Sequence, residues 1–297
     1  MGLSNCFNGL PIQTSRGQID SISKTATQGS STRKMTYDAA MRLTGVANQL
    51  NQSLESYTLS PEGNRVRSHT SSLHLTDEAN RLTEDEQFLY AHSLDNNLIA
   101  KTDKSTGDTS TYTYNRLDQM LTGEGVTWVY DAHGRAIRQR DATTDRRIVW
   151  DGWDAVRIDD LSNTNSLQRR TWVTHGLEQD ELLALTPKTT GTTPNTGPAT
   201  QSYYLHTDHQ GSVIGLSNDN GQLINQYTYD SHGNLQTQVE AYPQPFRFTG
   251  QQQDLSGKLL YYKHRMYDPK TGRFLQEDPL WFEAGDLNTY RTRGMTP

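Results

Sequence analysis

The feature that most constrains the fold of this chain is a six-residue motif that recurs along most of its length. The motif is clearest at 229–234 (YDSHGN), has a near-copy at 130–135 (YDAHGR) and has a weaker copy at 37–42 (YDAAMR). A catalytic site needs one constellation of residues, whereas an array of equivalent structural units needs many copies of one pattern. The repetition therefore indicates architecture before it indicates chemistry.

Degenerate copies of the motif keep the same frame. Aligned on the step from an aromatic residue to Asp, the copies begin at positions 37, 59, 76, 92, 114, 130 and 150, and the steps between them run from 16 to 22 residues. Tyr-Asp and Asp-Gly pairs are common in turns, but turn chemistry alone does not explain so many copies in register. The copy that begins at Trp150-Asp151 ends less regularly than the others.

Each copy predicts one β-hairpin. Aromatic residues alternate with Thr at 112–114 and 227–229, which is the period-2 pattern of a half-buried strand. Asp with Gly or Asn three residues later is typical of a tight turn, because Asp bonds the backbone two residues on and Gly or Asn tolerates positive φ. A lone hairpin is marginal in water, so the units must pair with their neighbours. We therefore predict an all-β fold of repeated antiparallel hairpins in a curved, spiralling sheet.

The composition agrees with a thin sheet that has little interior per residue. Hydrophobic residues make up 32% of the chain and the mean hydropathy is −0.82, values that approach those of disordered chains. The 15 Tyr, 6 Phe and 5 Trp, however, supply large surfaces for burial. The net charge of −6 and the pI of about 5.8 give no electrostatic footprint for nucleic acid.

The sequence shows no membrane span and no signal peptide. No apolar run approaches the roughly 18 residues that a span needs, and the first 31 residues lack the apolar core of a signal peptide. Cys6 is the only cysteine, so no intrachain disulfide can form. The cysteine count alone does not decide the cellular compartment of the protein.

Composition divides the chain into four segments. Residues 1–34 are polar and lie outside the repeat frame, so we expect them to be loosely ordered. Residues 35–185 hold the repeats, and 186–202 are rich in Pro, Thr and Gly, which indicates a surface loop. Residues 203–297 hold sharper motifs and form the last segment.

The motifs of this last segment resemble the RHS-repeat-associated core of bacterial RHS/YD-repeat proteins. They follow one another as 203–213 (YYLHTDHQGSV), 227–233 (YTYDSHG), 245–251 (PFRFTGQ), 267–274 (YDPKTGRF) and 277–280 (EDPL). The resemblance to the core covers about residues 203–290, and the weaker YD repeats cover about 35–180.

The resemblance implies a structural protein rather than an enzyme, with no cofactor. In this family the hairpins spiral into a hollow shell, the core plugs one end, and a toxin that follows the core is held inside until delivery. The implied partners are toxin cargo or further YD-repeat segments. The implied setting is a bacterial protein that is cytoplasmic before export or is secreted without a cleavable signal peptide. Because full-length relatives are far longer, we expect a truncated shell segment without its toxin, a remnant of such a protein.

The residues to which we assign a structural role in the motif are Tyr37, Asp38, Tyr130, Asp131, Gly134, Arg135, Tyr229, Asp230, Gly233, Tyr267, Asp268, Gly272 and Arg273.

We assign no catalytic residue. The family core continues with Asn-x-Tyr-x-Tyr and ends at Asp-Pro-x-Gly-Leu beside a self-cleavage point. Residues 288–291 match the start of that stretch, and 292–297 depart from it. Asp278 stands where an upstream family carboxylate would lie, but an aspartyl mechanism needs two carboxylates that share a proton. A residual aspartyl autoprotease that uses Asp278 stays as one alternative.

Three further patterns each have a functional and a structural interpretation. The run 206–209 (HTDH) could hold a metal, but the resemblance explains it as a structural signature, so we assign no metal site. Trp150 and Trp153 could stack on sugars, which keeps a carbohydrate- or surface-binding module as a second alternative, although Trp in an aromatic-rich sheet more often packs. The basic stretch 258–273 suits a solvated strand face better than a phosphate site.

Overall fold

A computed structural model describes residues 11–14, 18–26, 29–188, 201–279 and 288–291 of the chain. These residues form strands and turns with one short 3-10 helix, η1 (Phe248–Gly250), and their strand pairings are antiparallel. No helix among them is long and apolar enough to cross a membrane. The prediction of an all-β fold of antiparallel hairpins is confirmed. The contacts divide the chain into unit 1 (1–109 and 277–297) and unit 2 (110–276).

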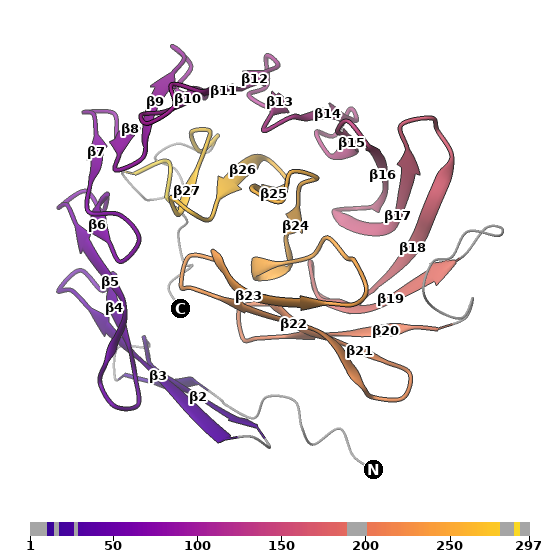
Figure 1. The fold of residues 1–297 in the computed structure, drawn as a ribbon, viewed down its shortest axis with the longest axis horizontal. Coiled ribbons are helices and arrows are strands. Elements are labelled where there is room, and N and C mark those ends of the chain that lie inside the picture. The colour runs from indigo at the N-terminus through magenta and orange to yellow at the C-terminus, as the bar shows by residue number, and fades with distance from the viewer. Residues whose placement is uncertain (1–10, 15–17, 27–28, 189–200, 280–287, 292–297) are drawn as a thin grey trace. The chain divides into compact units, whose positions relative to one another are not determined.

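Unit 1 contains two sheets in which each strand pairs with its neighbours in the sequence (Figure 1). The six-stranded sheet consists of β1 (Pro11–Gln13), β2 (Ile19–Ala26), β3 (Gly29–Tyr37), β4 (Leu43–Asn48), β5 (Ser53–Leu59) and β6 (Arg65–Ser68). The five-stranded sheet consists of β7 (His74–Thr76), β8 (Leu82–Asp85), β9 (Phe88–His92), β10 (Leu98–Asp103) and β11 (Thr109–Thr111), which begins at the last residue before unit 2.

Unit 2 contains a twelve-stranded sheet, which we call the wall, and a four-stranded sheet. The strands of the wall are β12 (Thr113–Tyr114), β13 (Met120–Gly123), β14 (Val126–Tyr130), β15 (Ala136–Arg140), β16 (Thr144–Asp151), β17 (Asp154–Ser162), β18 (Leu167–His175), β19 (Leu182–Lys188), β20 (Tyr203–Thr207), β21 (Val213–Asn218), β22 (Leu223–Tyr229) and β23 (Leu235–Glu240). The strands of the small sheet are β24 (Gln252–Gln253), β25 (Leu260–Tyr262), β26 (Arg265–Asp268) and β27 (Arg273–Phe274). In Figure 1 the wall follows a curve, and β24–β26 lie on its concave side.

One kind of turn joins most of the hairpins, and we call it the YD turn. The carbonyl of its first residue accepts a hydrogen bond from the N–H of its fourth residue. The N–H of the first residue donates to the carbonyl of the fifth residue, and the fourth residue has positive φ. This is the three-residue hairpin loop with a bulge beside it. A turn with the same backbone bonds begins at Arg247; in the others the first residue is Asp, Asn or Ser. These first residues are Asp38, Asn48, Ser60, Asp77, Ser93, Asn115, Asp131, Ser162, Asp208, Asn218 and Asp230.

The copy that begins at Trp150 is a different hairpin. Asp151 pairs with Asp154, so only Gly152 and Trp153 form the loop between β16 and β17. Gly152 has a φ of +55° at the first central position, which is where a two-residue hairpin loop places Gly. The irregular ending seen in the sequence therefore reflects a shorter turn.

The structure places some boundaries differently from the sequence prediction. Three strands, β1 to β3, begin within residues 11–34, so hairpin structure starts before residue 35; residues 1–10, 15–17 and 27–28 lie outside the described part. β19 and β20 pair across the predicted loop, so one sheet contains strands from both sides of it, while 189–200 also lie outside the described part. The predicted strand at 112–114 is interrupted at Tyr112, whose buried ring precedes β12.

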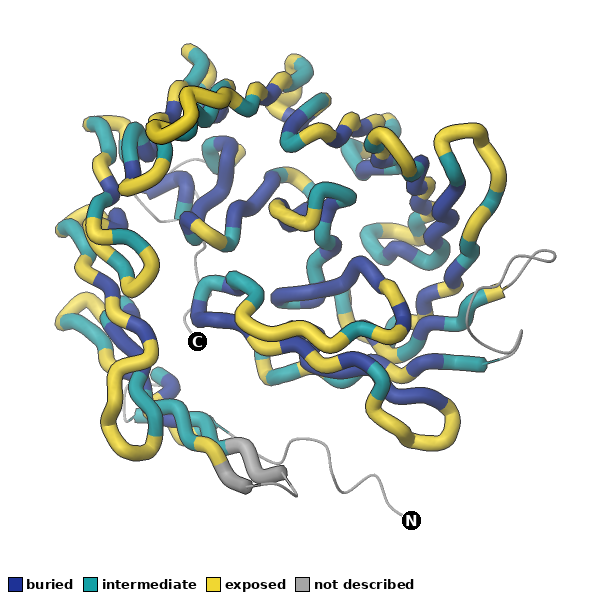
Figure 2. Tube along the Cα trace, viewed as in Figure 1, coloured by how far each residue is buried: buried dark blue, intermediate teal, exposed yellow. Residues whose placement is uncertain are grey.

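Burial follows the alternation of the strands. In Figure 2 buried and exposed residues alternate along much of the wall, and the small sheet on its concave side is mostly buried. In unit 1, residues from β2 to β5 form a core of their own. Its members are Ile19, Met35, Leu43, Val46 and Tyr57.

Candidate functional site

The turn at Asp131 shows how the motif residues work together. Asp131 Oδ1 accepts hydrogen bonds from the N–H groups of His133 and Arg135, both at 2.9 Å. Its Oδ2 accepts from Arg135 Nε at 2.8 Å and Nη2 at 2.7 Å. Gly134 supplies the residue with positive φ, at +84°. Desolvation alone would raise the pKa of Asp131, but the hydrogen bonds from Arg135 and the His133 amide lower it below its usual value.

The same carboxylate arrangement occurs at other copies of the motif. Asp38 and Asp77 bind the Arg four residues later at the same two oxygens. Asp230 accepts only the hydrogen bonds from backbone amides, because Asn234 stands in place of Arg. Gly233 in this turn has a φ of +83°. The turn after Tyr267 is longer by one residue. Asp268 still accepts from the amide of Lys270, but the Gly with positive φ, Gly272, comes four residues later, and Arg273 pairs with Asp268 across the hairpin.

The aromatic residue before the turn ties its strand to an earlier part of the sheet. The hydroxyls of Tyr37, Tyr130 and Tyr229 donate to the backbone carbonyls of Ile19, Met120 and Val213, at 2.7 to 2.8 Å. Burial raises the pKa of all three phenols, so each stays protonated and able to donate. Tyr therefore contributes both apolar burial and one directional bond.

Successive turns are also bonded to one another. In five YD turns the side chain of the fifth residue reaches the next turn at the same edge of the sheet, and we call this series the turn ladder. Its members are Arg42 to the carbonyls of Ser60 and Pro61, Asn64 to Asn80 Oδ1, Arg81 to Asn96 Oδ1, Gln119 to the carbonyl of Gly134, and Arg135 to the carbonyl of Gly152. At these five turns the fifth position couples one turn to the next turn at the same edge.

The chain after β23, residues 241–276, crosses the concave side of the wall, and we call it the inner segment. Its central contact is Tyr261 in β25. The Tyr261 hydroxyl accepts the N–H of Ala136 at 2.8 Å. Its ring lies 5.6 Å from the ring of Trp128 and 6.3 Å from that of Trp150. Tyr261 is 2% exposed, so two wall strands, β14 and β16, share one aromatic cluster with the inner segment.

The inner segment also contacts the turns of the wall. The hydroxyl of Tyr267 donates to the carbonyl of His232 at 2.8 Å. Gly233, beside it, packs against Phe248 so closely that a Cβ there would lie 2.4 Å from the Phe248 ring. Positive φ and this approach both require Gly at position 233.

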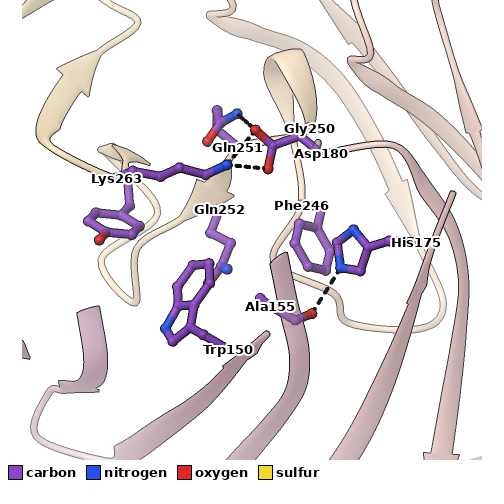
Figure 3. Close-up of a pocket in the computed structure, with 10 residues that line it drawn as sticks. Trp150, Ala155, His175, Asp180, Phe246, Gly250, Gln251, Gln252 and Lys263 are labelled. Carbon is purple, nitrogen blue, oxygen red and sulfur yellow. Dashed lines mark hydrogen bonds and ion pairs between the residues drawn. The ribbon is translucent and has the colours of Figure 1, made fainter. Parts of the chain in front are cut away.

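A small pocket lies between the inner segment and the loop after β18 (Figure 3). Lys263 Nζ lies 2.7 Å from each carboxylate oxygen of Asp180, and Gln251 Nε2 donates to the same carboxylate at 3.1 Å. His175 lines another side and binds the carbonyl of Ala155 through Nε2 at 3.0 Å. The space holds about one water molecule, so the pocket is a joint between two chain segments and too small for an organic substrate.

A buried carboxyl group lies at another joint of the inner segment. Asp254 is 4% exposed, and it accepts hydrogen bonds from Ser256 and from the amides of Lys258 and Leu259. Desolvation raises the pKa of Asp254 to about 6, and Glu124 adds to the rise. Lys258 bonds Glu124, in the turn between β13 and β14, at 2.5 Å.

A buried ion network ties the start of the inner segment to the wall. Asp160 lies between Arg146, at 2.8 Å, and Arg169, at 2.5 Å. Desolvation would raise the pKa of Asp160, but the two guanidinium groups lower it to about 2. Arg169 also donates to the carbonyl of Pro243 and lies over the ring of Tyr242. The network therefore links β16, β17 and β18 to the first residues after β23.

In unit 1, residues 288–291 bind to hairpin turns of that unit. Asn288 Nδ2 donates to Asn64 Oδ1 at 2.7 Å, and the hydroxyl of Tyr290 donates to the carbonyl of Asn96 at 2.7 Å. Asp278 is half-buried, and its amide donates to the carbonyl of Thr289 at 3.1 Å. The adjacent Glu277 accepts from Thr289 and Asn96 side chains. Residues 292–297, where the sequence departs from the family pattern, lie outside the described part.

The run 206–209 has local structural contacts. Asp208 begins a YD turn and accepts from the amides of Gln210 and Ser212, and His206 Nε2 lies 2.8 Å from Ser217 Oγ. Over the described residues, no group of three His, Cys, Asp or Glu side chains is arranged to hold a metal.

Both tryptophans that could have stacked on sugars are packed. Trp150 donates its indole N–H to the carbonyl of Ala136 at 2.8 Å, and Trp153 lies 5.0 Å from the ring of His264.

The interpretation of 258–273 as a solvated face is wrong for much of that stretch. The Lys263 side chain is 11% exposed and binds Asp180, and Arg273 is 9% exposed. Arg265 lies 3.7 Å over the ring of Phe274. The alternation of basic and aromatic residues reflects a tightly packed small sheet in which the cations have partners.

The arrangement defines a class: a repeat wall built from YD hairpins, with the following chain folded against its concave face. Residues 13–297 match the family model of the Teneurin YD-shell. The chain belongs to this family and is a segment of a YD-repeat shell, which confirms the resemblance to RHS/YD-repeat proteins.

Similar proteins include named toxins. The chain is 27% identical to "Probable deoxyribonuclease RhsB" of Dickeya dadantii over 88% of its own length and 20% of that protein. It is 26% identical to "Double-stranded DNA deaminase toxin A" of Burkholderia cenocepacia over 86% of its length and 20% of the toxin. The chain thus spans about a fifth of these relatives. The crystal structure of TcdB2-TccC3-Cdc42 shares the fold with a TM-score of 0.53 at 14% identity, covering 98% of this chain and 20% of that one.

Proposed function

We propose that this chain is a wall section of a toxin-delivery shell, in which the inner segment braces the concave face of the wall and no residue has a catalytic role. The support is that the chain belongs to a shell family and that one relative matched over most of its length is named a deaminase toxin and another a probable deoxyribonuclease. The partner in this proposal is a toxin segment, or further YD-repeat hairpins, of a longer protein.

One observation carries the proposal: the inner segment is bonded to hairpins from the first to the last of the wall. Its contacts, in the order of the wall strands, are Gln276 to the Asp118 carbonyl, Lys258 to Glu124, Tyr261 to Ala136, Lys263 to Asp180, Thr249 to Ser212, and Tyr267 to the His232 carbonyl. A segment that binds one hairpin would only extend the sheet, whereas one that binds hairpins along the whole wall fixes its curvature.

The test is a chimera in which this chain replaces the aligned fifth of RhsB from Dickeya dadantii. We expect protease to digest the C-terminal region of RhsB no faster in the chimera than in the parent RhsB. The Tyr261→Ala chimera should lose protection, and the Tyr204→Ala chimera, changed at an exposed wall residue, should keep it. A chimera with a β-type circular dichroism spectrum whose C-terminal region is digested at the rate of the free region would contradict the proposal.

The absence of a catalytic role has its own test. We expect the purified chain to keep its full mass on prolonged incubation, because residues 292–297 depart from the Asp-Pro-x-Gly-Leu element that ends the family core beside its self-cleavage point. Asp278→Asn should behave identically by mass spectrometry. Time-dependent loss of a C-terminal peptide that Asp278→Asn abolishes would establish an autoprotease instead.

A further inference from the structure

The outward face of β15 to β19 carries a row of four cations and one carboxylate. Arg138 pairs with Arg147, Arg147 with Asp159, Asp159 with Arg170, and Arg170 with Lys188, so one row crosses five strands. The alternate residues of the same strands face the interior and are buried; they include Gln139, Ile148, Ile158 and Val173. Successive strands lie about 4.8 Å apart, so the row extends over roughly 20 Å of sheet.

The ion pairs of this face leave an excess of positive charge. Asp145 is shared by Arg138, at 2.7 Å, and Arg147, at 3.2 Å. Asp159 is shared in the same way by Arg170, at 2.8 Å, and Arg157, at 3.4 Å. Two carboxylates therefore hold four guanidinium groups in place. Such fixed groups lose little side-chain entropy on binding an anion.

The remaining cation, Lys188, is exposed and forms no ion pair with a described residue. Its ammonium lies 5.8 Å over the ring of Trp172, and Arg157 lies 5.6 Å from the same ring. Trp172 and Val149 are each 38% exposed, and each is the cross-strand partner of Arg157. An exposed indole beside an aliphatic side chain thus lies next to the row of cations.

We propose that this surface, which we call the cationic face (Arg138, Arg147, Arg157, Arg170, Lys188 and Trp172), binds an anionic phospholipid membrane surface. Cations with a Trp anchor are the combination that binds at the headgroup layer of anionic bilayers. A broad sheet face suits an extended surface, whereas a small ligand would need a concave site.

Nucleic acid fits this face less well, for two reasons. The chain as a whole has a net charge of −6, which opposes a long polyanion beyond the patch itself. An exposed Val beside the Trp gains nothing from a phosphate backbone, whereas it gains from transfer into the acyl boundary of a bilayer.

The test uses the full chain and vesicle sedimentation. Vesicles of phosphatidylglycerol and phosphatidylcholine in equal parts are compared with pure phosphatidylcholine, at about 50 and about 500 mM salt, because high salt screens surface charges. We expect binding to the anionic vesicles at low salt, with at least a tenfold loss at high salt or without the anionic lipid. Because each cation near such a surface contributes about a fivefold change in partition, Lys188→Glu should weaken binding at least fivefold.

Two further variants separate this face from general electrostatics. Trp172→Ala should weaken vesicle binding several-fold without changing the net charge, and its circular dichroism should match that of the parent. Arg116→Glu, at an exposed residue of the turn after β12, makes the same charge change as Lys188→Glu and should leave binding within twofold. Equal losses in the two charge variants, equal binding to neutral vesicles, or tighter binding to a short DNA duplex than to vesicles would each overturn the proposal.

Discussion

The wall and the inner segment of unit 2 contain similar turns and similar aromatic residues, but different contacts hold them in place. Each wall strand pairs with its neighbours in the sequence, and the turn ladder bonds one turn to the following turn. The inner segment instead depends on side chains that meet residues far away in the chain, such as Tyr261 with Ala136 and Gln276 with Asp118. The difference implies that damage to a wall turn stays local, whereas damage to the inner segment affects many hairpins together.

The largest expected effect is at Tyr261. Tyr261→Ala should lower the free energy of unfolding by about 3–5 kcal/mol, because it leaves a cavity and removes the acceptor of a buried amide. Tyr204→Ala is the matched control on the wall, since Tyr204 is 46% exposed, and it should cost about 1 kcal/mol or less. Urea unfolding followed by circular dichroism measures both. Similar losses at the two positions would show that the inner segment is no more critical than the wall surface.

Two glycines in wall turns allow a direct comparison of the wall with the inner segment, because only one of them contacts the inner segment. Gly125 has a φ of +79° and open space where a Cβ would be, whereas Gly233 has a φ of +83° and Phe248 at 2.4 Å. Gly125→Ala should cost about 1–2 kcal/mol from the backbone alone. Gly233→Ala should cost about 1–3 kcal/mol more, since Phe248 must shift. The comparison fails if thermal unfolding gives the two variants the same stability.

Asp254 should make the stability of the inner segment depend on pH. The pKa of Asp254 in the fold is about 6 and that of an unperturbed Asp is 3.8, so the folded state binds the proton more tightly than the unfolded chain. The resulting stabilisation is complete below pH 4 and is lost as the pH rises through 6, by up to about 3 kcal/mol. Asp254→Asn keeps an oxygen for the local amides and should flatten this dependence. Unfolding curves at several pH values test it, and an unchanged slope in the variant would exclude Asp254 as the source.

The smallest effect is expected at a wall turn. Asp131→Ala removes the acceptor of two backbone amides and should cost about 1–2 kcal/mol. Asp131→Asn keeps an acceptor oxygen and loses only the partly exposed ion pair with Arg135, so it should cost below about 1 kcal/mol. Hydrogen exchange can show whether the loss stays within the β14–β15 hairpin. If Asn is as damaging as Ala, the ion pair rather than the amide bonds maintains the turn.

The sequence predicts the wall better than the inner segment, because the wall is built from local rules. An acceptor side chain followed three residues later by Gly or Asn suffices to identify turns such as that of Asp131. The turns at Asn48, Ser162 and Asn218 lie outside the aligned copies of the motif, although Asn or Gly stands at their fourth position. Contacts such as Tyr261 with Ala136 have no periodic signal, since they depend on how the whole sheet curves. The sequence also does not predict the ion pairs of the basic residues in 258–273, such as Lys263 with Asp180, because these contacts depend on the curvature of the sheet as well.

The turn ladder has a consequence for how such walls change in length. Because the side chains of the turn ladder bond one turn to the next turn at the same edge, duplication or deletion of one complete hairpin alters a single junction of the ladder and leaves its other junctions unchanged. Stability then grows by nearly equal steps with the number of hairpins. A change of one strand instead of two would move every later turn to the opposite edge of the sheet. Copy number in whole hairpins is therefore the variable that a lineage of these proteins can change at small cost, and odd numbers of strands are the changes that selection should remove.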